Sequence, residues 1–504
     1  MTAGPAAEDV ALRMGSARGR WVLLTTVLGS GLAMLDATVV NVALGRIGED
    51  LDAGFDGLQW TINAYTLTLA ALILLGGSLG DRFGRRRIFL IGVVWFALAS
   101  LLCGIAPDIG TLIAARGLQG IGGALLTPGS LAIIAASFHS EDRSAAVGAW
   151  SGLGGIAAAI GPLVGGWLVE LNWRLVFLVN VPVAVVILVI AVRHVPESKD
   201  PEAVARLDLT GTALAVVGLG ALTFALTRAG EAGFNGSVLT TVGAGLACLV
   251  AFVVVEARSS HPLVPLGLFR NTQFSAANAV TLLVYAALGV IFVLLVLQLQ
   301  VVAGWSPIVA GSSMLPVTVL MLLFSSRAGA LAQRIGPRLP MTLGPVLSAA
   351  GVLWMGAITA GASYFFDVLP PVLLFGAGLS LMVAPLTATV LDAAEDRHAG
   401  IASGVNNAVA RTAGLLAVAV IPVAAGIAGA DYTDAAAFDA GFGRAMLISA
   451  GLLLVGAALA AAFIRKPLAA AEESAGDAGR VHIEECTHCG VSGPQLHPAC
   501  RSPE

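Results

Sequence analysis

The chain has 504 residues, of which 57% are hydrophobic and 12% charged, and its formal net charge is −4. The apolar residues fall in blocks of about twenty, the length of helix that crosses a hydrocarbon core at roughly 1.5 Å per residue. This composition excludes a chain that is soluble throughout. It predicts an all-α membrane protein with many spans.

We expect fourteen transmembrane helices. Arg13, Arg18 and Arg20 precede a first apolar segment that is too long for a cleavable signal, so the first helix is expected to be retained. The predicted spans are residues 21–44, 58–80, 88–106, 111–136, 144–168, 175–193, 209–227, 237–257, 274–300, 308–332, 339–362, 368–391, 398–427 and 443–464.

The first predicted span contains a carboxylate, Asp36. An ionisable group inside a membrane is costly and is therefore a candidate functional residue. Burial favours its neutral form and a nearby cation favours its charged form, so a conformational change can load and release a proton. The alternative is a structural acid bonded to a neighbouring helix.

A charged turn follows the second span. Gly77, Asp81, Arg82, Gly84 and Arg85 lie in it, and Asp81 is expected to accept hydrogen bonds from amides that open a neighbouring helix. The pattern Gly-x-Leu-x-Asp-Arg-x-Gly-Arg-Arg resembles the major facilitator superfamily of transporters. The alternative is a generic positive loop, which would not need glycines and an acid at these spacings.

Basic residues concentrate in the segments on the side of this turn. By the positive-inside rule, both termini are therefore cytoplasmic, in a multi-pass protein of the cell inner (cytoplasmic) membrane.

Arg116 lies in span four at nearly the depth of Asp36 and is its expected partner. Arg116, Gln119 and Gly120 resemble the Arg-x-x-Gln-Gly motif of the family, which implies a part in proton transfer. A purely structural arginine is the alternative.

Span five carries Gly161, Pro162, Gly165 and Gly166, which resemble part of the antiporter signature, with Ala159 in place of its middle glycine. The glycines allow close helix contact, and Pro162 makes the helix bendable. The resemblance supports export, and ordinary tight packing is the alternative.

The two halves of the chain repeat, since residues 329–338 repeat the pattern of the charged turn with Gln333 in the place of Asp81. Residues 266–271 resemble the entry to the second half in fourteen-helix drug:proton antiporters. The implied fold is the major facilitator fold, with two six-helix bundles plus two inserted helices. The expected segments are 1–20 (cytoplasmic N-terminal segment), 21–194 (first bundle), 195–273 (linker with two inserted helices), 274–465 (second bundle) and 466–504 (cytoplasmic tail).

A substrate cavity between the halves is expected. Span ten, residues 308–332, contains no acid, which favours monocationic, neutral or weakly acidic amphiphiles over dications. The candidate lining residues are Asn41, Tyr65, Gln119, Trp150, Tyr285, Asn407 and Arg411.

The tail contains Cys486, Cys489, His497 and Cys500, whose spacing fits a tetrahedral zinc site. A disordered tail without metal is the alternative interpretation.

These features predict a proton-coupled antiporter that exports amphipathic drugs or antibiotics by alternating access, with a dedicated exporter of one endogenous metabolite as the alternative. A membrane receptor or scaffold is a further class, and an ATP-driven pump is disfavoured because no phosphate-binding Gly-x-x-x-x-Gly-Lys-Ser/Thr loop occurs. The protein is expected to be a monomer and not an enzyme. Its partners are a small amphipathic molecule, protons and the lipid bilayer. No cofactor beyond the proton gradient and no nucleic acid are expected.

Overall fold

The computed structural model describes residues 12–199, 208–259, 262–394, 399–427 and 434–465. Helices dominate this part of the chain, and its only β-type pairing is an isolated bridge between Leu12 and Phe138. The first helices are α1 (Ala17–Asp50), α2 (Phe55–Phe83), α3 (Arg85–Gly104), α4 (Ile109–Ser137), α5 (Ser140–Leu171), α6 (Leu175–Leu178), α7 (Asn180–His194), α8 (Leu209–Ala232) and α9 (Gly236–Arg258).

The second half begins with a short helix, η1 (Leu266–Arg270), which contains the Leu-Phe-Arg stretch noted in the sequence. The remaining elements are α10 (Thr272–Leu297), η2 (Gln298–Val302), α11 (Pro307–Ser312), α12 (Leu315–Ile335), α13 (Arg338–Met355), η3 (Tyr364–Val368), α14 (Leu369–Asp392), α15 (Ala399–Ala424) and α16 (Ala435–Phe463).

Twelve helices in the described ranges are long and apolar enough to cross a membrane. The prediction of fourteen spans is therefore not confirmed. The predicted ranges 144–168 and 339–362 fall on α5 and α13, which are not among the twelve. Part of the difference is that α13 has only 18 residues and begins with Arg338, which lowers its mean hydropathy.

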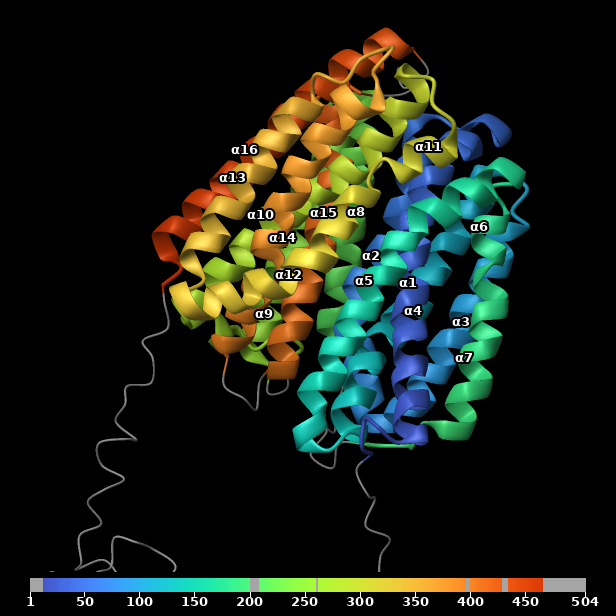
Figure 1. Ribbon diagram of the computed structural model, residues 1–504. Coiled ribbons are helices and arrows are strands. Elements are labelled where there is room, and N and C mark those ends of the chain that lie inside the picture. Colours follow the sequence, from blue (N-terminus) through green and yellow to red (C-terminus); the bar gives the residue numbers. More distant parts are fainter. Residues whose placement is uncertain (1–11, 200–207, 260–261, 395–398, 428–433, 466–504) are drawn as a thin grey trace, which may run out of the picture. The chain divides into compact units, whose positions relative to one another are not determined.

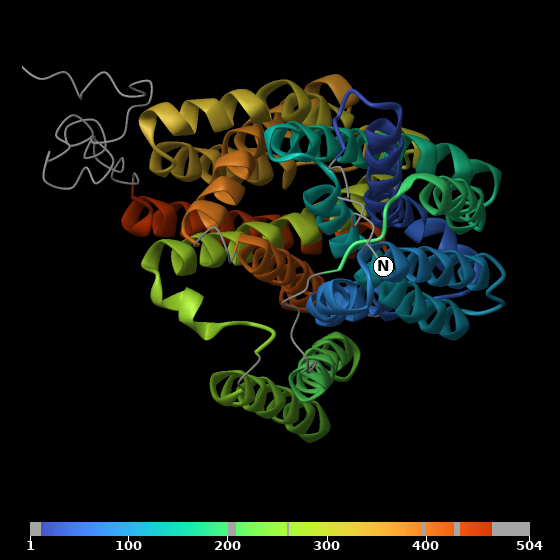
Figure 2. The same ribbon diagram turned by 90° about the horizontal axis from the view of Figure 1, so that it is seen from below.

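The helices pack as two groups with a hairpin beside them. In the first group α4 lies against α2 and α3, and α1 lies against α5 and α7. In the second, α14 lies against α12 and α13, and α10 lies against α15 and α16. Helices α8 and α9 pair with each other, and α8 also contacts α2 and α15. Figure 2 shows this green pair at the edge of the helices.

The two groups meet at the end where α1 finishes and α2 begins. Gln59 of α2 donates to the Val418 carbonyl of α15 at 2.7 Å, and Gln300 donates to the Val42 carbonyl at 3.1 Å. A continuous cluster of buried apolar side chains from both groups surrounds these contacts. Figure 1 shows α11 reaching across to the first group at this end.

Candidate functional site: a buried ion pair between α1 and α4

Asp36 lies on α1 and is completely buried. Its Oδ2 accepts a hydrogen bond from Arg116 Nη1 at 2.5 Å. Its Oδ1 accepts from Gln119 Nε2 at 2.8 Å and from Asn180 Nδ2 at 3.0 Å. A carboxylate so deep in an apolar bundle needs this many donors, because each unpaired lone pair would be costly.

Arg116 is equally buried and its guanidinium has several partners. Nε donates to the Thr61 carbonyl of α2 at 3.0 Å, and Nη1 also lies 2.5 Å from Gln119 Oε1. The guanidinium carbon lies 4.3 Å from the centre of the Tyr65 ring, a cation–π distance. The structure therefore brings Asp36 and Arg116 together as an ion pair that α2 and α7 also contact.

The depths of Asp36 and Arg116 agree, as the sequence predicted, but their distances from the helix ends differ from the predicted ones. Helix α1 continues to Asp50, past the predicted boundary at 44, and α4 starts at Ile109. Asp36 is thus about 21 Å from the end of its helix and Arg116 about 10 Å from the start of its own, at 1.5 Å per residue. The depths agree because α1 projects beyond α4.

Two of the residues expected to line a cavity belong to this cluster instead. Gln119 is fully buried and also donates to Ser100 Oγ at 2.8 Å. Tyr65 is 2% exposed, and its hydroxyl lies 3.5 Å from the Ala33 carbonyl. Both side chains therefore support the ion pair.

Sequence reasoning missed Asn180 and Ser100. Asn180 is the first residue of α7 and Ser100 lies on α3, and both are fully buried. A polar amide at the start of an otherwise apolar span was a usable signal for Asn180. A serine inside an apolar helix gives a much weaker signal, because it can bond its own backbone.

The glycines of α5 make close contacts with two different helices. A methyl group on Gly161 would meet Thr38 Oγ1 at 2.0 Å, and one on Gly165 would meet the Val39 Cα at 3.0 Å, both on α1. A methyl group on Gly166 would lie 2.4 Å from the Ile308 Cα of α11. Pro162 lies within α5, but its side chain is outside the described part of the structure. These glycines set how closely α5 approaches both groups.

The charged turn is organised by an acid that the sequence analysis did not select. Asp81 pairs with the Arg85 side chain at 2.8 Å, which differs from the expected contact with backbone amides. The amides that open α3, those of Arg86 and Arg87, instead donate to Glu197 at 3.0 and 3.2 Å. Glu197 occupies this place because the positive end of the α3 dipole favours an anion.

Three other residues of the turn have distinct surroundings. Gly84 has φ 116°, a conformation that favours glycine, and a side chain there would also collide with Glu197. Arg82 is exposed and lies over the Phe83 ring at 5.0 Å. A methyl group on Gly77 would be in ordinary contact with Pro128 of α4.

The remaining cavity candidates are dispersed. Trp150 donates to Ser30 Oγ at 3.1 Å, and Asn407 is exposed, with its amide 3.4 Å from the Ser403 carbonyl. Arg411 is partly buried on α15. Asn41 is partly buried on α1.

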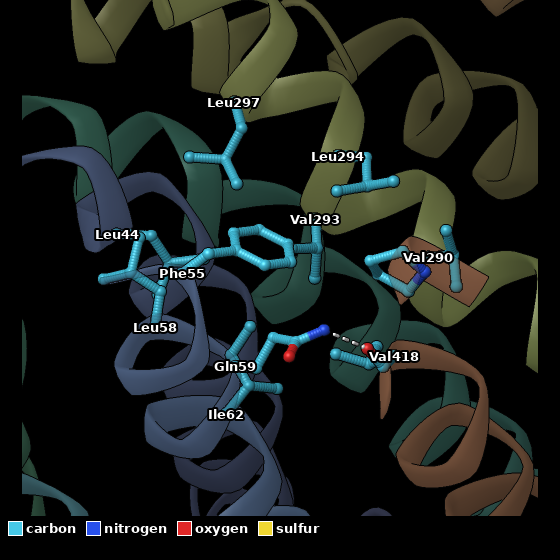
Figure 3. A pocket seen from close by; sticks show the side chains of 11 residues that line it. Leu44, Phe55, Leu58, Gln59, Ile62, Val290, Val293, Leu294, Leu297 and Val418 are labelled. Carbon is cyan, nitrogen blue, oxygen red and sulfur yellow. Dashed lines mark hydrogen bonds between the residues drawn. The ribbon is translucent and has the colours of Figure 1, made fainter. Parts of the chain in front are cut away.

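Two described pockets lie away from these candidates. One, drawn in Figure 3, is an apolar gap of about 10 Å³ between α1, α2, α10 and α15, crossed by the Gln59–Val418 hydrogen bond. That volume is no more than one water molecule needs, so it cannot hold a drug. The other has about 650 Å³ and is lined by α5, α11, α12, η3 and α14, including Leu163, Ser312 and Tyr364. None of the seven cavity candidates lines either pocket.

The tail residues Cys486, Cys489, His497 and Cys500 lie outside the described residues, so the structure does not test the proposed zinc site. Elsewhere in the described ranges, no group of three or more potential metal ligands comes together.

Comparison with known proteins identifies the family. The model of the Major Facilitator Superfamily matches residues 26–419. The chain belongs to the major facilitator superfamily. It is therefore a multi-pass membrane transporter for small molecules, and this family does not consist of enzymes.

Relatives of this transporter include drug-resistance proteins. Multidrug resistance protein Stp of Mycobacterium tuberculosis is 37% identical over 77% of the chain and 72% of the relative. Puromycin resistance protein pur8 of Streptomyces alboniger is 35% identical over 93% of the chain and 95% of the relative. Among solved structures, a D-xylose-proton symporter superposes with a TM-score of 0.64 at 16% identity, covering 89% of this chain and 99% of that one. The all-helical transporter fold is thus shared well beyond the resistance proteins.

Proposed function

We propose that this transporter is a proton-coupled antiporter that exports amphipathic drugs or antibiotics across the cytoplasmic membrane. Its cargo is monocationic, neutral or weakly acidic. The protein acts as a monomer with both termini in the cytoplasm. Helices α5 and α13 are its two further spans, since 18 residues at 1.5 Å each already give about 27 Å, close to the thickness of a hydrocarbon core.

The observation that carries the proposal is the buried Asp36–Arg116 pair. A carboxylate in the membrane interior is costly and therefore indicates a function, and three neighbouring side chains, those of Arg116, Gln119 and Asn180, donate to this one. Protonation of Asp36 would remove its charge and leave Arg116 uncompensated. The pair therefore favours different helix arrangements in its two protonation states.

The contacts between the two helix groups support alternating access. They include Gln59 with Val418, Gln300 with Val42, and Gly166 with Ile308, all near the outer end in the proposed orientation. These polar contacts are few, but the buried apolar side chains that surround them must also separate when this end opens. Related halves that rock around a central site are the usual means of alternating access in such transporters.

A dedicated exporter of one metabolite remains the second candidate, and the names of two relatives favour it. A probable actinorhodin transporter of Streptomyces coelicolor is 34% identical over 89% of the chain, and a tetracenomycin C resistance and export protein of Streptomyces glaucescens is 33% identical over 81%. Each is named for a single compound. The breadth of substrates accepted therefore separates the two candidates.

The decisive experiment is uptake into inverted vesicles under an imposed pH gradient, with puromycin, tetracenomycin C and unrelated amphiphiles as cargo. Uptake that depends on the gradient is expected for several compounds. Transport of one compound alone would select the dedicated exporter. Asp36→Asn should abolish uphill uptake, whereas Glu49→Gln, an exposed acid on the same helix, should not. If uptake by Asp36→Asn still depends on the pH gradient as before, Asp36 does not carry the coupled proton.

A further inference from the structure

Asn180 contacts Asp36, the proposed proton carrier, but only the nitrogen of its side-chain amide forms hydrogen bonds. It opens α7 directly after the break at Val179, and its side chain is fully buried. Its Nδ2 lies 3.0 Å from Asp36 Oδ1 and 3.3 Å from Ser100 Oγ. Its Oδ1 is buried and has no hydrogen-bond partner. An unpaired amide oxygen in this position is costly, so it calls for a functional explanation.

Gln119, the other amide beside Asp36, is fully engaged at both ends. Its Oε1 accepts from Arg116, and its Nε2 donates to Asp36 and to Ser100. Turning this amide over would place its NH₂ group against the Arg116 guanidinium, donor to donor. Gln119 is therefore fixed as a donor to Asp36, whereas reversal of Asn180 would break no bond at its oxygen.

Protonation changes what Asp36 requires of its neighbours. A carboxylate only accepts hydrogen bonds, but a carboxylic acid must also donate one. Arg116 of α4 is the charged group that contacts Asp36, and two titratable groups contact its partners: Tyr65 of α2 lies against Arg116, and Cys103 of α3 lies 3.8 Å from Gln119 Oε1. Within the described faces of α5, α6 and α7, no charged side chain forms an ion pair with it. Asn180 Oδ1 is the nearby acceptor with no existing bond.

We propose that Asn180 is a positioning residue that reverses its amide when Asp36 is protonated. With the carboxylate, Nδ2 donates to Oδ1 of Asp36. When a proton from water forms an O–H bond on Oδ1, the reversed amide accepts that hydrogen bond through its own oxygen. When the proton returns to water, the amide turns back. This inference rests on the proposed function, in which Asp36 carries the proton.

A matched pair of variants tests the role in transport. Asn180→Thr supplies a hydroxyl that can donate or accept, and Asn180→Val has the same shape with neither capacity. Uphill uptake in inverted vesicles should fall about tenfold further in Val than in Thr, as expected for a lost hydrogen bond at a buried charged group. Downhill exchange should differ much less between them. Equal uphill uptake in the two variants would overturn the proposal, and the Ser and Ala variants repeat the comparison with smaller side chains.

Infrared difference spectra across pH measure the hydrogen bonding of protonated Asp36, which would not depend on Asn180 if that residue were merely structural. The carboxylic acid band of Asp36 is identified by its loss in Asp36→Asn. Its frequency should shift more in Asn180→Val than in Asn180→Thr, because only Val leaves the acid without a partner. An equal band frequency in both variants would overturn the role of Asn180 and leave the proton assignment to Asp36 standing. Absence of any Asp36 band in the unchanged protein would overturn the proton assignment together with this inference.

Discussion

Each helix group joins a carboxylate and an amide on its first and last long helices, but in opposite order. In the first group the acid, Asp36, is on α1 and the amide, Asn180, is on α7. In the second the amide, Gln298, begins η2 directly after α10 and donates to Asp439 on α16. Asp36 is fully buried beside an arginine, whereas Asp439 is partly exposed in the second turn of its helix.

This difference separates an acid suited to coupling from one suited to structure. Within the described residues no arginine or lysine forms an ion pair with Asp439. Asp439 is partly exposed in this conformation, so water reaches it without any opening of the helices. Asp36 can exchange only when the surrounding helices open, which is the condition for tying a proton to cargo movement.

The largest expected effect comes from exchanging each acid for its amide. Asp36→Asn should abolish uphill, pH-driven export but permit downhill exchange. Asp439→Asn should leave uphill export within about twofold, the range of a substitution away from critical contacts. Uptake into inverted vesicles, compared with counterflow at zero gradient, measures both. Loss of uphill export in Asp439→Asn would contradict this difference between the two acids and would assign coupling to both helix groups.

The stability of the buried pair gives the second prediction. Arg116→Ala should lower the free energy of unfolding by about 3–5 kcal/mol, because it leaves the Asp36 charge buried without a cation. Adding Asp36→Asn to that variant should recover part of the loss. Arg46→Ala, which removes an exposed pair with Glu49, should cost at most about 1 kcal/mol. Denaturant unfolding of the three variants and of the unchanged protein in detergent measures these losses, and similar losses for Arg116→Ala and Arg46→Ala would contradict the buried pair.

The charged turns of the two groups offer a third and smaller test. Gly84 and Gly336 have φ values of 116° and 91°, and each amide bonds the carbonyl four residues earlier. Asp81 pairs with Arg85, whereas the side chain of Gln333 forms no hydrogen bond or ion pair within the described residues. The turn geometry is therefore repeated, but its charge pairing is not.

Asp81→Asn should reduce transport about fivefold without reducing the amount of inserted protein, the equivalent of roughly 1 kcal/mol for a charge-assisted bond. Gln333→Ala should have little effect. Initial transport rates normalised to protein in the membrane measure both. Normal rates in Asp81→Asn at normal protein levels would reject a role for this acid.

The sequence predicted the helices and the central contact but not the residues around it. Apolar blocks and the family motifs placed Asp36 and Arg116 at similar depth, and depth along two helices is readable from residue spacing. Asn180 and Glu197 were missed because their roles depend on which faces of α7 and α3 meet. The amide at the start of α7 was a signal that a polar group is buried there, but a single sequence does not say which helix faces meet.

The same limit explains the dispersed cavity candidates. Tyr65 and Gln119 were predicted to line a cavity, yet Gln119 donates to Asp36 and the Tyr65 ring lies against the Arg116 guanidinium. The first span was also predicted to end at residue 44, six residues before the end of α1. Helix propensity and packing continue that helix to Asp50.

The smallest expected effect concerns the tail, which has no part in the proposed coupling. Deleting residues 477–504 should leave export unchanged, because the proposed coupling groups and the contacts between the helix groups all lie before residue 465. Four soft ligands spaced as Cys486, Cys489, His497 and Cys500 can nevertheless hold zinc. Metal analysis of the purified full-length protein, paired with transport by the truncated protein and by Cys486→Ser, distinguishes these interpretations. Zinc at one per chain, lost together with export in Cys486→Ser, would show that the tail acts on the transporter.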